Sequence, residues 1–245
     1  MRFQDRVVIV TGAAGGIGLA TCRRFARDGA RLLLADHDAG KSASAAEEVR
    51  AAGAPDVLPC ECDVGSEDEV LRCVDAAIAR WGRLDVVVNN AGTMIFKPIE
   101  QHTEDDLLHV LRVDLFGAVW FTKQLFLKGR PGSSVVNVAS VHAVQTTPLV
   151  AAYAAAKAAL VSFTRSTAIE GRTKGIRANV VLPGAIETPM LRENPNVKSG
   201  AEKIDPADVG RPEDVADAIA WLASTDAAFV TGAELRVDGG RLARL

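Results

Sequence analysis

Short apolar runs alternate with longer segments of helical periodicity along almost the whole chain. The apolar runs, rich in Val, Ile and Leu, predict seven strands, at residues 7–10, 31–35, 57–60, 85–88, 134–139, 177–182 and 234–237. The segments between them predict helices at residues 17–28, 41–52, 67–81, 103–127, 151–170 and 212–222. Strands that are apolar throughout and alternate with helices form parallel sheets covered on both faces. We therefore expect an α/β fold: one doubly wound, Rossmann-type domain over residues 1–245 with a seven-stranded parallel sheet.

Residues 189–210 form the one long stretch without strong periodicity. Turn signals occur in it at Asn194-Pro195-Asn196 and at Ser199-Gly200. Its length and position fit a lid over a substrate site and a plain surface loop equally well.

Composition and charge narrow the classes of partner. The 245 residues are 48% hydrophobic and 24% charged, and the formal net charge is −3. Without a global positive field, the chain has no means of gathering nucleic acid or an anionic membrane, so we expect small-molecule partners. A strand predicted from residue 7 leaves no room for a signal peptide, and no apolar stretch reaches membrane-spanning length. We expect a cytoplasmic protein.

The cysteines and histidines give no pattern of a metal site. Cys22, Cys60, Cys62 and Cys73 lack paired ligand spacing, and reduced, buried thiols are expected. Cys60 and Cys62 are interpreted as side chains on opposite faces of a strand. No metal is predicted.

A glycine-rich turn follows the first predicted strand and opens into a helix. It contains Gly12, Gly15, Gly16, Ile17 and Gly18. Glycines there allow backbone N–H groups to approach a pyrophosphate at the positive end of the helix dipole. Asp36 ends the second predicted strand, where its carboxylate can accept hydrogen bonds from an adenosine ribose and would repel a 2′-phosphate. The alternative for Asp36 is a turn or capping role. The pattern favours NAD over NADP.

Two further loops follow strands three and four, at the edge where doubly wound folds bind ligands. Asp63 can accept a hydrogen bond from an adenine amino group. Asn90, Ala91 and Gly92 offer small residues where the backbone approaches a dinucleotide, although ordinary turns also use Asn and Gly.

The only tyrosine of the chain, Tyr153, stands four residues before Lys157 in an alanine-rich run. On a helix, this spacing places phenol and ammonium side by side on one face. The ammonium favours phenolate, and a lowered pKa would let the phenol act as an acid and a base near neutral pH. Ser140 can hold a substrate oxygen in line with that phenol.

Taken together, Thr11-Gly12, Gly16, Gly18, Asn89-Asn90-Ala91-Gly92, Ser140, Tyr153, Lys157, Pro183-Gly184 and Thr188 resemble the short-chain dehydrogenase/reductase family over nearly the whole chain. Extended, epimerase-type relatives have a different glycine spacing and usually a longer chain. The resemblance implies strand order 3-2-1-4-5-6-7, a homotetramer, and reversible hydride transfer between nicotinamide and an alcohol or ketone.

The resemblance also implies a role for single residues. Tyr153 would be the general acid/base, Ser140 would orient the substrate oxygen, and Lys157 would bind the nicotinamide ribose. Pro183, Gly184, Ile186 and Thr188 would fix the carboxamide end of the cofactor, and Val64 would line the adenine pocket.

Asp114 departs from the family pattern. Members of the family usually have Asn in a Val-Asn-Leu-x-Gly motif, and here the residues are Val113-Asp114-Leu115-Phe116-Gly117. Aspartate has the shape to hold the water that links Lys157 to solvent, but its charge opposes formation of phenolate. We expect retained activity with an altered pH dependence.

Residues expected to face the substrate are Met94, Phe96, His142, Gln145 and Met190. Most are apolar, with a few polar contacts, which indicates a secondary alcohol or ketone. Ser140-Val141-His142 resembles sugar and hydroxy-acid dehydrogenases of the family over a short stretch.

Two other functions remain open. A β-ketoacyl carrier-protein reductase would use a cationic patch for its carrier, and the candidate cations are Lys128, Arg130, Arg165, Arg172 and Lys174. Asp36 disfavours the NADPH that this activity commonly uses. A nicotinamide-sensing protein without catalysis is the third candidate, and the intact Ser140, Tyr153 and Lys157 set argues against it.

A homotetramer agrees with one further feature of the chain. The predicted helix at residues 103–127 is apolar on more than one face, and this apolar surface is wider than packing on one sheet requires. Without the resemblance, burial within a large monomer would explain this surface equally well.

Overall fold

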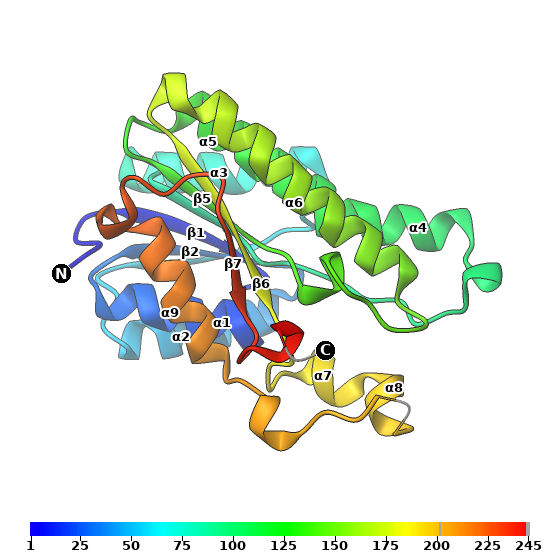
Figure 1. The fold of residues 1–245 in the computed structure, drawn as a ribbon. Helices are drawn as coiled ribbons and strands as arrows, with labels where there is room; N and C mark the ends of the chain where they lie inside the picture. The colour runs from blue at the N-terminus through cyan, green and yellow to red at the C-terminus, as the bar shows by residue number, and fades with distance from the viewer. Residues whose placement is uncertain (201, 244–245) are drawn as a thin grey trace.

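All seven strands lie in one parallel sheet, and the predicted strand order is confirmed. The order is β3-β2-β1-β4-β5-β6-β7 (Figure 1). This computed structural model describes residues 1–200 and 202–243; residue 201 of the predicted lid and residues 244–245 of the predicted domain lie outside the described residues. The strands are β1 (Val7–Thr11), β2 (Arg31–Asp36), β3 (Val57–Glu61), β4 (Val86–Asn89), β5 (Ser134–Val138), β6 (Arg177–Pro183) and β7 (Glu234–Val237).

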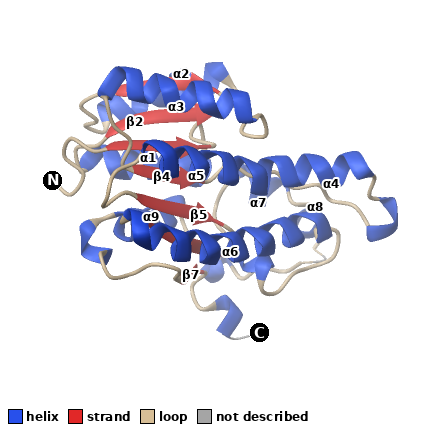
Figure 2. Cartoon of the chain, turned by 90° about the horizontal axis from the view of Figure 1, so that it is seen from above, coloured by secondary structure: helices blue, strands red, loops and turns tan. Residues whose placement is uncertain are grey.

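Helices cover both faces of the sheet. They are α1 (Gly16–Arg27), α2 (Ala39–Ala51), α3 (Glu67–Trp81), α4 (Glu104–Leu111), α5 (Gly117–Lys128), α6 (Ala151–Gly171), α7 (Pro189–Glu193), α8 (Pro195–Lys198) and α9 (Pro212–Ala223). One apolar cluster joins α1, α2 and α9 to the sheet, and another joins α3, α5 and α6. Seen from above, α4 extends beyond the strands (Figure 2). None of the helices in the described part of the chain has the length and apolar character to span a membrane.

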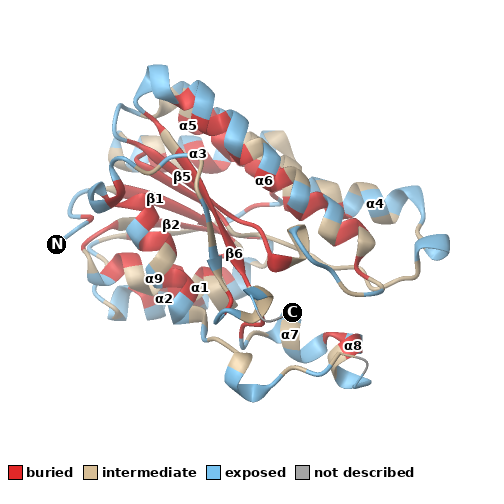
Figure 3. Ribbon diagram, viewed as in Figure 1, coloured by how far each residue is buried: buried red, intermediate tan, exposed pale blue. Residues whose placement is uncertain are grey.

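The strands of the centre are buried because both of their faces are covered (Figure 3). In β1, Val8 and Val10 belong to the cluster with α1, whereas Val7 and Ile9 belong to the cluster with α3. All four side chains are inaccessible to solvent. Burying both faces explains why the strands read as continuous apolar runs in the sequence.

The predicted helix at residues 103–127 is present without a break, and it contains a π turn. α4 begins with a capping box between Thr103 and Asp106 and continues through a π-helical segment, Arg112–Phe116, into α5. The sequence did not indicate the π turn, which accommodates an extra residue and redirects the side chains within it. Asp114 lies in this segment and its side chain is buried.

The segment at residues 189–210 contains more regular structure than its sequence indicated. Thr188 caps α7, which has Pro189 in its first turn, and Asn194 caps α8. The segment then returns to the sheet, where the Gly210 N–H donates to the Ala185 carbonyl at 2.9 Å. Both of its ends are therefore fixed beside the carboxyl end of β6.

The cysteines are free thiols, and three of them lie together. Cys60 of β3 and Cys62, which directly follows this strand, pack in the same apolar cluster as Cys73 of α3. The prediction that Cys60 and Cys62 face opposite sides was wrong, because residues two apart on a strand share a face.

Candidate active site

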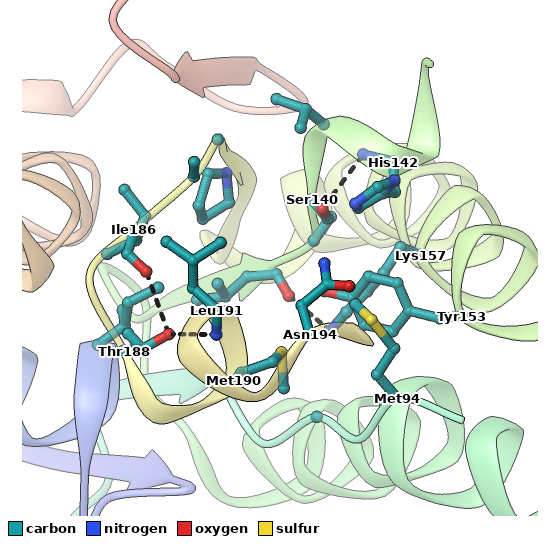
Figure 4. A pocket seen from close by; sticks show the side chains of 18 of the residues that line it. Met94, Ser140, His142, Tyr153, Lys157, Ile186, Thr188, Met190, Leu191 and Asn194 are labelled. Carbon is teal, nitrogen blue, oxygen red and sulfur yellow. Dashed lines mark hydrogen bonds between the residues drawn. The ribbon is translucent and has the colours of Figure 1, made fainter. Parts of the chain in front are cut away.

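A cavity of about 360 Å³ opens at the carboxyl ends of the central strands. The glycine turn contributes to its wall. Ser140, Tyr153 and Lys157 line the same cavity (Figure 4). The predicted site residues that line it are Gly12, Gly15, Gly16, Ile17, Asn90, Ala91, Gly92, Met94, Ser140, His142, Gln145, Tyr153, Lys157, Pro183, Gly184, Ile186, Thr188 and Met190. The predicted residues that do not line it are Gly18, Asp36, Asp63, Val64, Phe96 and Asp114.

Phe96 was predicted to face the substrate, and the structure does not place it there. It belongs to the loop before α4, whose neighbouring Lys97 N–H donates to the Leu149 carbonyl at 3.0 Å. Met94 lies two residues earlier and does reach the cavity. The position of a residue in this loop of the sequence does not show whether its side chain points into the cavity.

The glycine turn needs glycine for different reasons at different positions. Gly12 and Gly16 have φ angles of +59° and +50°, which L side chains rarely adopt. Gly18 has no such angle, but a Cβ there would lie 2.0 Å from the Gly12 carbonyl oxygen. A Cβ at Gly15 would meet nothing within 4 Å.

Hydrogen bonds with the loop after β4, the strand beside β1 in the sheet, hold the glycine turn in place. The Thr11 hydroxyl accepts the N–H groups of Asn90 and Ala91, both at 2.9 Å. The Asn90 amide in turn donates to the carbonyls of Thr11 at 2.9 Å and Gly12 at 3.1 Å. Asn90 therefore positions the glycine turn with its own side chain, in addition to lining the cavity.

The start of α1 fits a pyrophosphate. Gly15 occupies the N-cap position, and no side chain of the described residues caps the helix there, whereas Ser66 accepts the Glu69 N–H at the start of α3. The first N–H groups of α1 are thus available to an anion at the positive end of the helix. The residues present fit the phosphate part of a nicotinamide dinucleotide.

Asp36 lies between the glycine turn and the turn after β2. Its Oδ2 accepts the Ala14 N–H at 2.9 Å and its Oδ1 accepts the Asp38 N–H at 3.2 Å. The turn role considered for this residue is therefore present. A carboxylate has about four acceptor positions, so further hydrogen bonds to a ribose diol remain available.

Asp63 and Val64 lie after β3, outside the cavity. Asp63 is exposed, and its Oδ1 accepts the Gly65 N–H at 2.9 Å. Val64 is buried, and a Cβ at Gly117 would lie 2.8 Å from the Val64 Cβ. Both residues shape the loop beside the π-helical segment.

Tyr153 and Lys157 project from the first turns of α6 into the cavity wall. Their exposed fractions are 6% and 3%, and the Lys157 Nζ lies 5.5 Å from the centre of the phenol ring. The Lys157 Nζ also donates to the Val138 carbonyl at the end of β5, at 3.0 Å. Ser140 follows this strand, and its Oγ accepts the His142 N–H at 3.1 Å. The His142 ring lies edge-on to Tyr153, with 6.0 Å between ring centres.

Asp114 reaches the same ammonium group directly. Its Oδ1 lies 3.1 Å from the Lys157 Nζ, and its Oδ2 accepts the Thr93 N–H at 3.0 Å. A Cβ at Gly92 would lie 2.9 Å from Asp114 Oδ1, so glycine leaves room for the pair. The expected water-mediated position of Asp114 is thus replaced by a direct ion pair inside the protein.

This ion pair changes the electrostatics of the phenol. Burial raises the pKa of Tyr153; Lys157 opposes the rise, Asp114 adds to it, and a hydrogen bond with Ser140 opposes it. The pKa of Tyr153 therefore stands above its ordinary value, contrary to the lowering expected from Lys157 alone. Burial lowers the pKa of Lys157, but Asp114 raises it above its usual range. Burial also raises the pKa of Asp114, against the opposing effects of Lys157 and the Thr93 N–H.

Several residues of the wall were not predicted from the sequence. The Val138 carbonyl holds Lys157, and any residue at that position would supply it. The cavity is also lined by Thr147, Leu191, Asn194, Glu202, Ile204, Arg241 and Leu242. Most of these residues come from the segment at 189–210 and from the chain after β7, neither of which has a recognisable motif.

Comparison with known proteins agrees with this fold and site. The family model described as "Enoyl-(Acyl carrier protein) reductase" matches residues 12–241. The chain belongs to the short-chain dehydrogenase/reductase family, whose members are oxidoreductases that use a nicotinamide cofactor.

Three relatives illustrate the range of similar proteins. The chain is 41% identical to 4-formylbenzenesulfonate dehydrogenase of Comamonas testosteroni, over 98% of this chain and 99% of the relative. It is 36% identical to a 3-oxoacyl-(acyl-carrier-protein) reductase of Thermotoga maritima, over 98% and 99% of the two chains. A solved 3-ketoacyl-(acyl-carrier-protein) reductase of Brucella melitensis, complexed with NADH, has a TM-score of 0.87 at 31% identity and covers 97% of this chain and 98% of its own.

Proposed function

We propose that the protein is an NAD-dependent oxidoreductase that transfers hydride between nicotinamide and a secondary alcohol or ketone. The observation that supports this most directly is the convergence of Ser140, Tyr153 and Lys157 on the wall of the cavity that also contains the glycine turn. In this proposal, Tyr153 exchanges the proton of the substrate oxygen, Ser140 orients that oxygen, and Lys157 holds the ribose next to the nicotinamide.

The bound nicotinamide supplies or receives the hydride, and the protein handles the proton. In ketone reduction the neutral Tyr153 phenol donates its proton to the carbonyl oxygen. In alcohol oxidation the Tyr153 phenolate removes the proton from the hydroxyl group. The Ser140 hydroxyl donates a hydrogen bond to the same oxygen and stabilises the charge that develops on it. The Lys157 ammonium stabilises phenolate, and Asp114 weakens that effect because it pairs with the ammonium.

NAD is proposed in preference to NADP because of Asp36. Its carboxylate is held next to the glycine turn by two backbone N–H groups, at 2.9 and 3.2 Å. A 2′-phosphate in this region would meet a fixed negative charge. In the same proposal, Asp63 and Val64 border the adenine, and Pro183, Gly184, Ile186 and Thr188 border the carboxamide.

The segment at residues 189–210 is proposed to act as a lid over the substrate. It contributes Met190, Leu191 and Asn194 to the cavity wall, opposite Tyr153 (Figure 4). The Asn196 amide donates to the Pro148 carbonyl at 2.9 Å, so the segment already touches the loop that precedes α6.

A carrier-protein reductase is the second candidate, because two of the three similar proteins, from Thermotoga maritima and Brucella melitensis, are named as reductases of this kind. The cations considered for carrier binding give it little support. Lys128 pairs with Asp75, and Arg165 pairs with Glu234 at 2.6 Å. Lys128 and Arg172 lie at the ends of α5 and α6, before β5 and β6 begin, and thus at the amino edge of the sheet, away from the cavity.

We also propose that the protein is a homotetramer and that it lies in the cytoplasm. Four free thiols are compatible with a reducing compartment. Exposed apolar side chains on elements at the β7 edge of the sheet support the tetramer.

The proposed function is tested by binding and turnover in one set of experiments. We expect the protein to bind NADH more tightly than NADPH and to oxidise NADH in the presence of ketones, which it reduces to secondary alcohols. Tyr153→Phe should bind NADH unchanged and lose turnover by at least about a hundredfold, because general acid/base catalysis contributes about 10²–10⁴-fold. NADH binding without any Tyr153-dependent turnover over a broad ketone panel would favour the sensing protein, and selective use of acyl-carrier substrates with NADPH would favour the second candidate.

A further inference from the structure

A partly buried ion pair lies in the wall of the substrate cavity, apart from the residues that carry the chemistry. The Arg241 Nη2 donates to the Glu202 Oε1 at 2.8 Å, and the two side chains are 18% and 11% exposed. Both residues line the cavity together with His142 and Tyr153. Glu202 belongs to the segment at residues 189–210, and Arg241 follows β7. The pair therefore joins two segments that are distant in the sequence.

The Arg241–Glu202 pair leaves no unpaired positive charge among the described residues of the cavity wall. Among the described lining residues, the cationic side chains are Lys157 and Arg241, with His142 as a third titratable nitrogen group. Lys157 is paired with Asp114 at 3.1 Å, and Arg241 is paired with Glu202. Burial lowers the pKa of His142, Glu202 opposes this and Arg241 adds to it, so the imidazole is neutral near neutral pH. An anionic substrate would therefore find no free cation and would meet the Glu202 carboxylate.

Hydrogen-bonding capacity in the same wall is incompletely used. The second oxygen of Glu202, Oε2, is buried without a hydrogen-bond partner among the described residues, and so is the Thr147 hydroxyl. A buried carboxylate oxygen without a donor is unfavourable, so a donor supplied by a ligand would be favoured. A hydroxyl group fits this need, because it donates to Glu202 and can accept from the guanidinium group of Arg241.

We propose that Glu202 and Arg241 form a subsite for a hydroxyl group of the substrate, remote from the reacting carbon. The substrate class is then a neutral alcohol or ketone that carries a second hydroxyl group, as a diol, polyol or hydroxy ketone does. Carboxylate and sulfonate substrates are excluded by the same pair. This inference rests on the proposed function and specifies the substrate of that site.

The test compares cyclohexanones that carry a hydroxyl, a methyl or a carboxylate group at carbon 3 or carbon 4. One of the two positions, carbon 3 or carbon 4, should place the substituent at the subsite better. In that series, the hydroxyl compound should have the highest kcat/KM for NADH-dependent reduction. Glu202→Gln should reduce the hydroxyl-to-carboxylate ratio of kcat/KM by about tenfold to a hundredfold, because a hydrogen bond to a charged group is lost and Arg241 becomes unpaired. Glu193→Gln, an exposed glutamate of α7 that does not line the cavity, is the matched control and should leave the ratio unchanged.

A second readout keeps this inference separate from the proposed reaction. Calorimetric binding of the same ketones to the NADH complex of Tyr153→Phe measures the subsite without turnover, and it should show the same order and the same response to Glu202→Gln.

If the methyl ketone is reduced in a Tyr153-dependent manner but the hydroxyl group gives no advantage, the subsite is wrong and the proposed function stands. If the carboxylate compound binds best to the unaltered cavity, Arg241 receives an anion and the subsite is again wrong. If the hydroxyl compound binds as expected but no ketone is reduced, the reaction is wrong and the subsite stands.

Discussion

At the scale of single residues, Asp114 is the position at which this chain departs most clearly from its family. The sequence shows the substitution, and its negative charge was expected to act on Tyr153. What the sequence does not show is that the carboxylate lies 3.1 Å from the Lys157 Nζ, because that contact depends on the π-helical segment that turns Asp114 inward. Burial holds the pKa of Tyr153 above its ordinary value, and the Asp114 carboxylate adds to that rise.

Asp114→Asn should lower the pKa of Tyr153, because Asn keeps the hydrogen bond from the Thr93 N–H and removes the charge. Alcohol oxidation needs phenolate and increases as pH rises through this pKa, so its ascending limb should move to lower pH. Ketone reduction needs the neutral phenol and declines as pH rises through the same pKa, so its decline should also move to lower pH. The profiles of kcat/KM against pH in both directions measure the shift.

Asp85→Asn provides the control for the loss of a buried carboxylate. Asp85 is 3% exposed and pairs with Arg83 at 2.6 Å, away from the cavity. Its substitution should leave both limbs in place. Superimposable profiles for Asp114→Asn and the unaltered protein would show that Asp114 has no effect on the phenol.

Asp36 provides a second prediction at this scale. Asp36→Asn should reduce the preference for NADH over NADPH by roughly tenfold or more, because removing one charge near a 2′-phosphate is worth about 1.4 kcal/mol. Fluorescence titration of both cofactors gives the ratio of Kd values. Asp38→Asn removes a charge two residues away and should change the ratio much less. An equal effect of the two substitutions would indicate that only the overall charge of this region matters.

At the scale of elements, the glycine turn shows how closely local sequence can specify a site. Its position between β1 and α1 is visible in the sequence, and so is the need for small residues. The individual reason for each glycine is not visible, because Gly18 is constrained by the Gly12 carbonyl and Gly15 is not constrained by any neighbour within 4 Å. The π turn between α4 and α5 is a comparable case, because the residues at 103–127 have an ordinary helical pattern throughout.

Gly18→Ala and Gly15→Ala should therefore differ strongly in stability without cofactor. The methyl group added at Gly18 would meet the backbone at 2.0 Å, and relief requires the turn to move, at a cost of about 2–3 kcal/mol. Gly15→Ala places its methyl group in open space and should cost less than about 1 kcal/mol as a change at an N-cap. Urea unfolding of the two variants measures the difference. Equal unfolding midpoints would show that the turn is free to relax around Gly18.

At the scale of the whole molecule, the parallel sheet and the cavity at its carboxyl edge follow from the alternation of apolar runs and helices, whereas the strand order was implied by the resemblance to the family. Residues contributed by recognisable motifs, such as Tyr153 and Lys157, were predicted from the sequence. Glu202 and Arg241 were not, because neither belongs to a motif and their contact forms only when the chain after β7 returns to the segment at 189–210. Tertiary contacts of this kind have no local signature.

The surface beside β7 bears on assembly. β7 is at the edge of the sheet and pairs only with β6 among the described strands. Ile169 of α6, Trp221 of α9 and Phe229 near β7 have exposed fractions of 72%, 39% and 104%. The Arg165–Glu234 ion pair fixes α6 next to β7. An open strand edge flanked by exposed apolar side chains is typical of a surface that pairs with another copy.

We expect light scattering to give a mass of roughly four times the 25.8 kDa of one chain. The family resemblance implies a homotetramer, and tetramers with two-fold symmetry are the commonest closed homo-oligomers after dimers. Phe229→Asp should reduce this mass to that of a dimer, because it places a charge where an apolar side chain would be buried against a partner. Leu71→Asp, on the exposed side of α3 at the other half of the sheet, should leave the mass unchanged. A monomer mass for the unaltered protein would contradict the tetramer. A tetramer that survives Phe229→Asp would place the interface on another face. The half-buried apolar side of α4 and α5 would then be the surface to substitute, because this apolar side is wider than packing against one sheet requires.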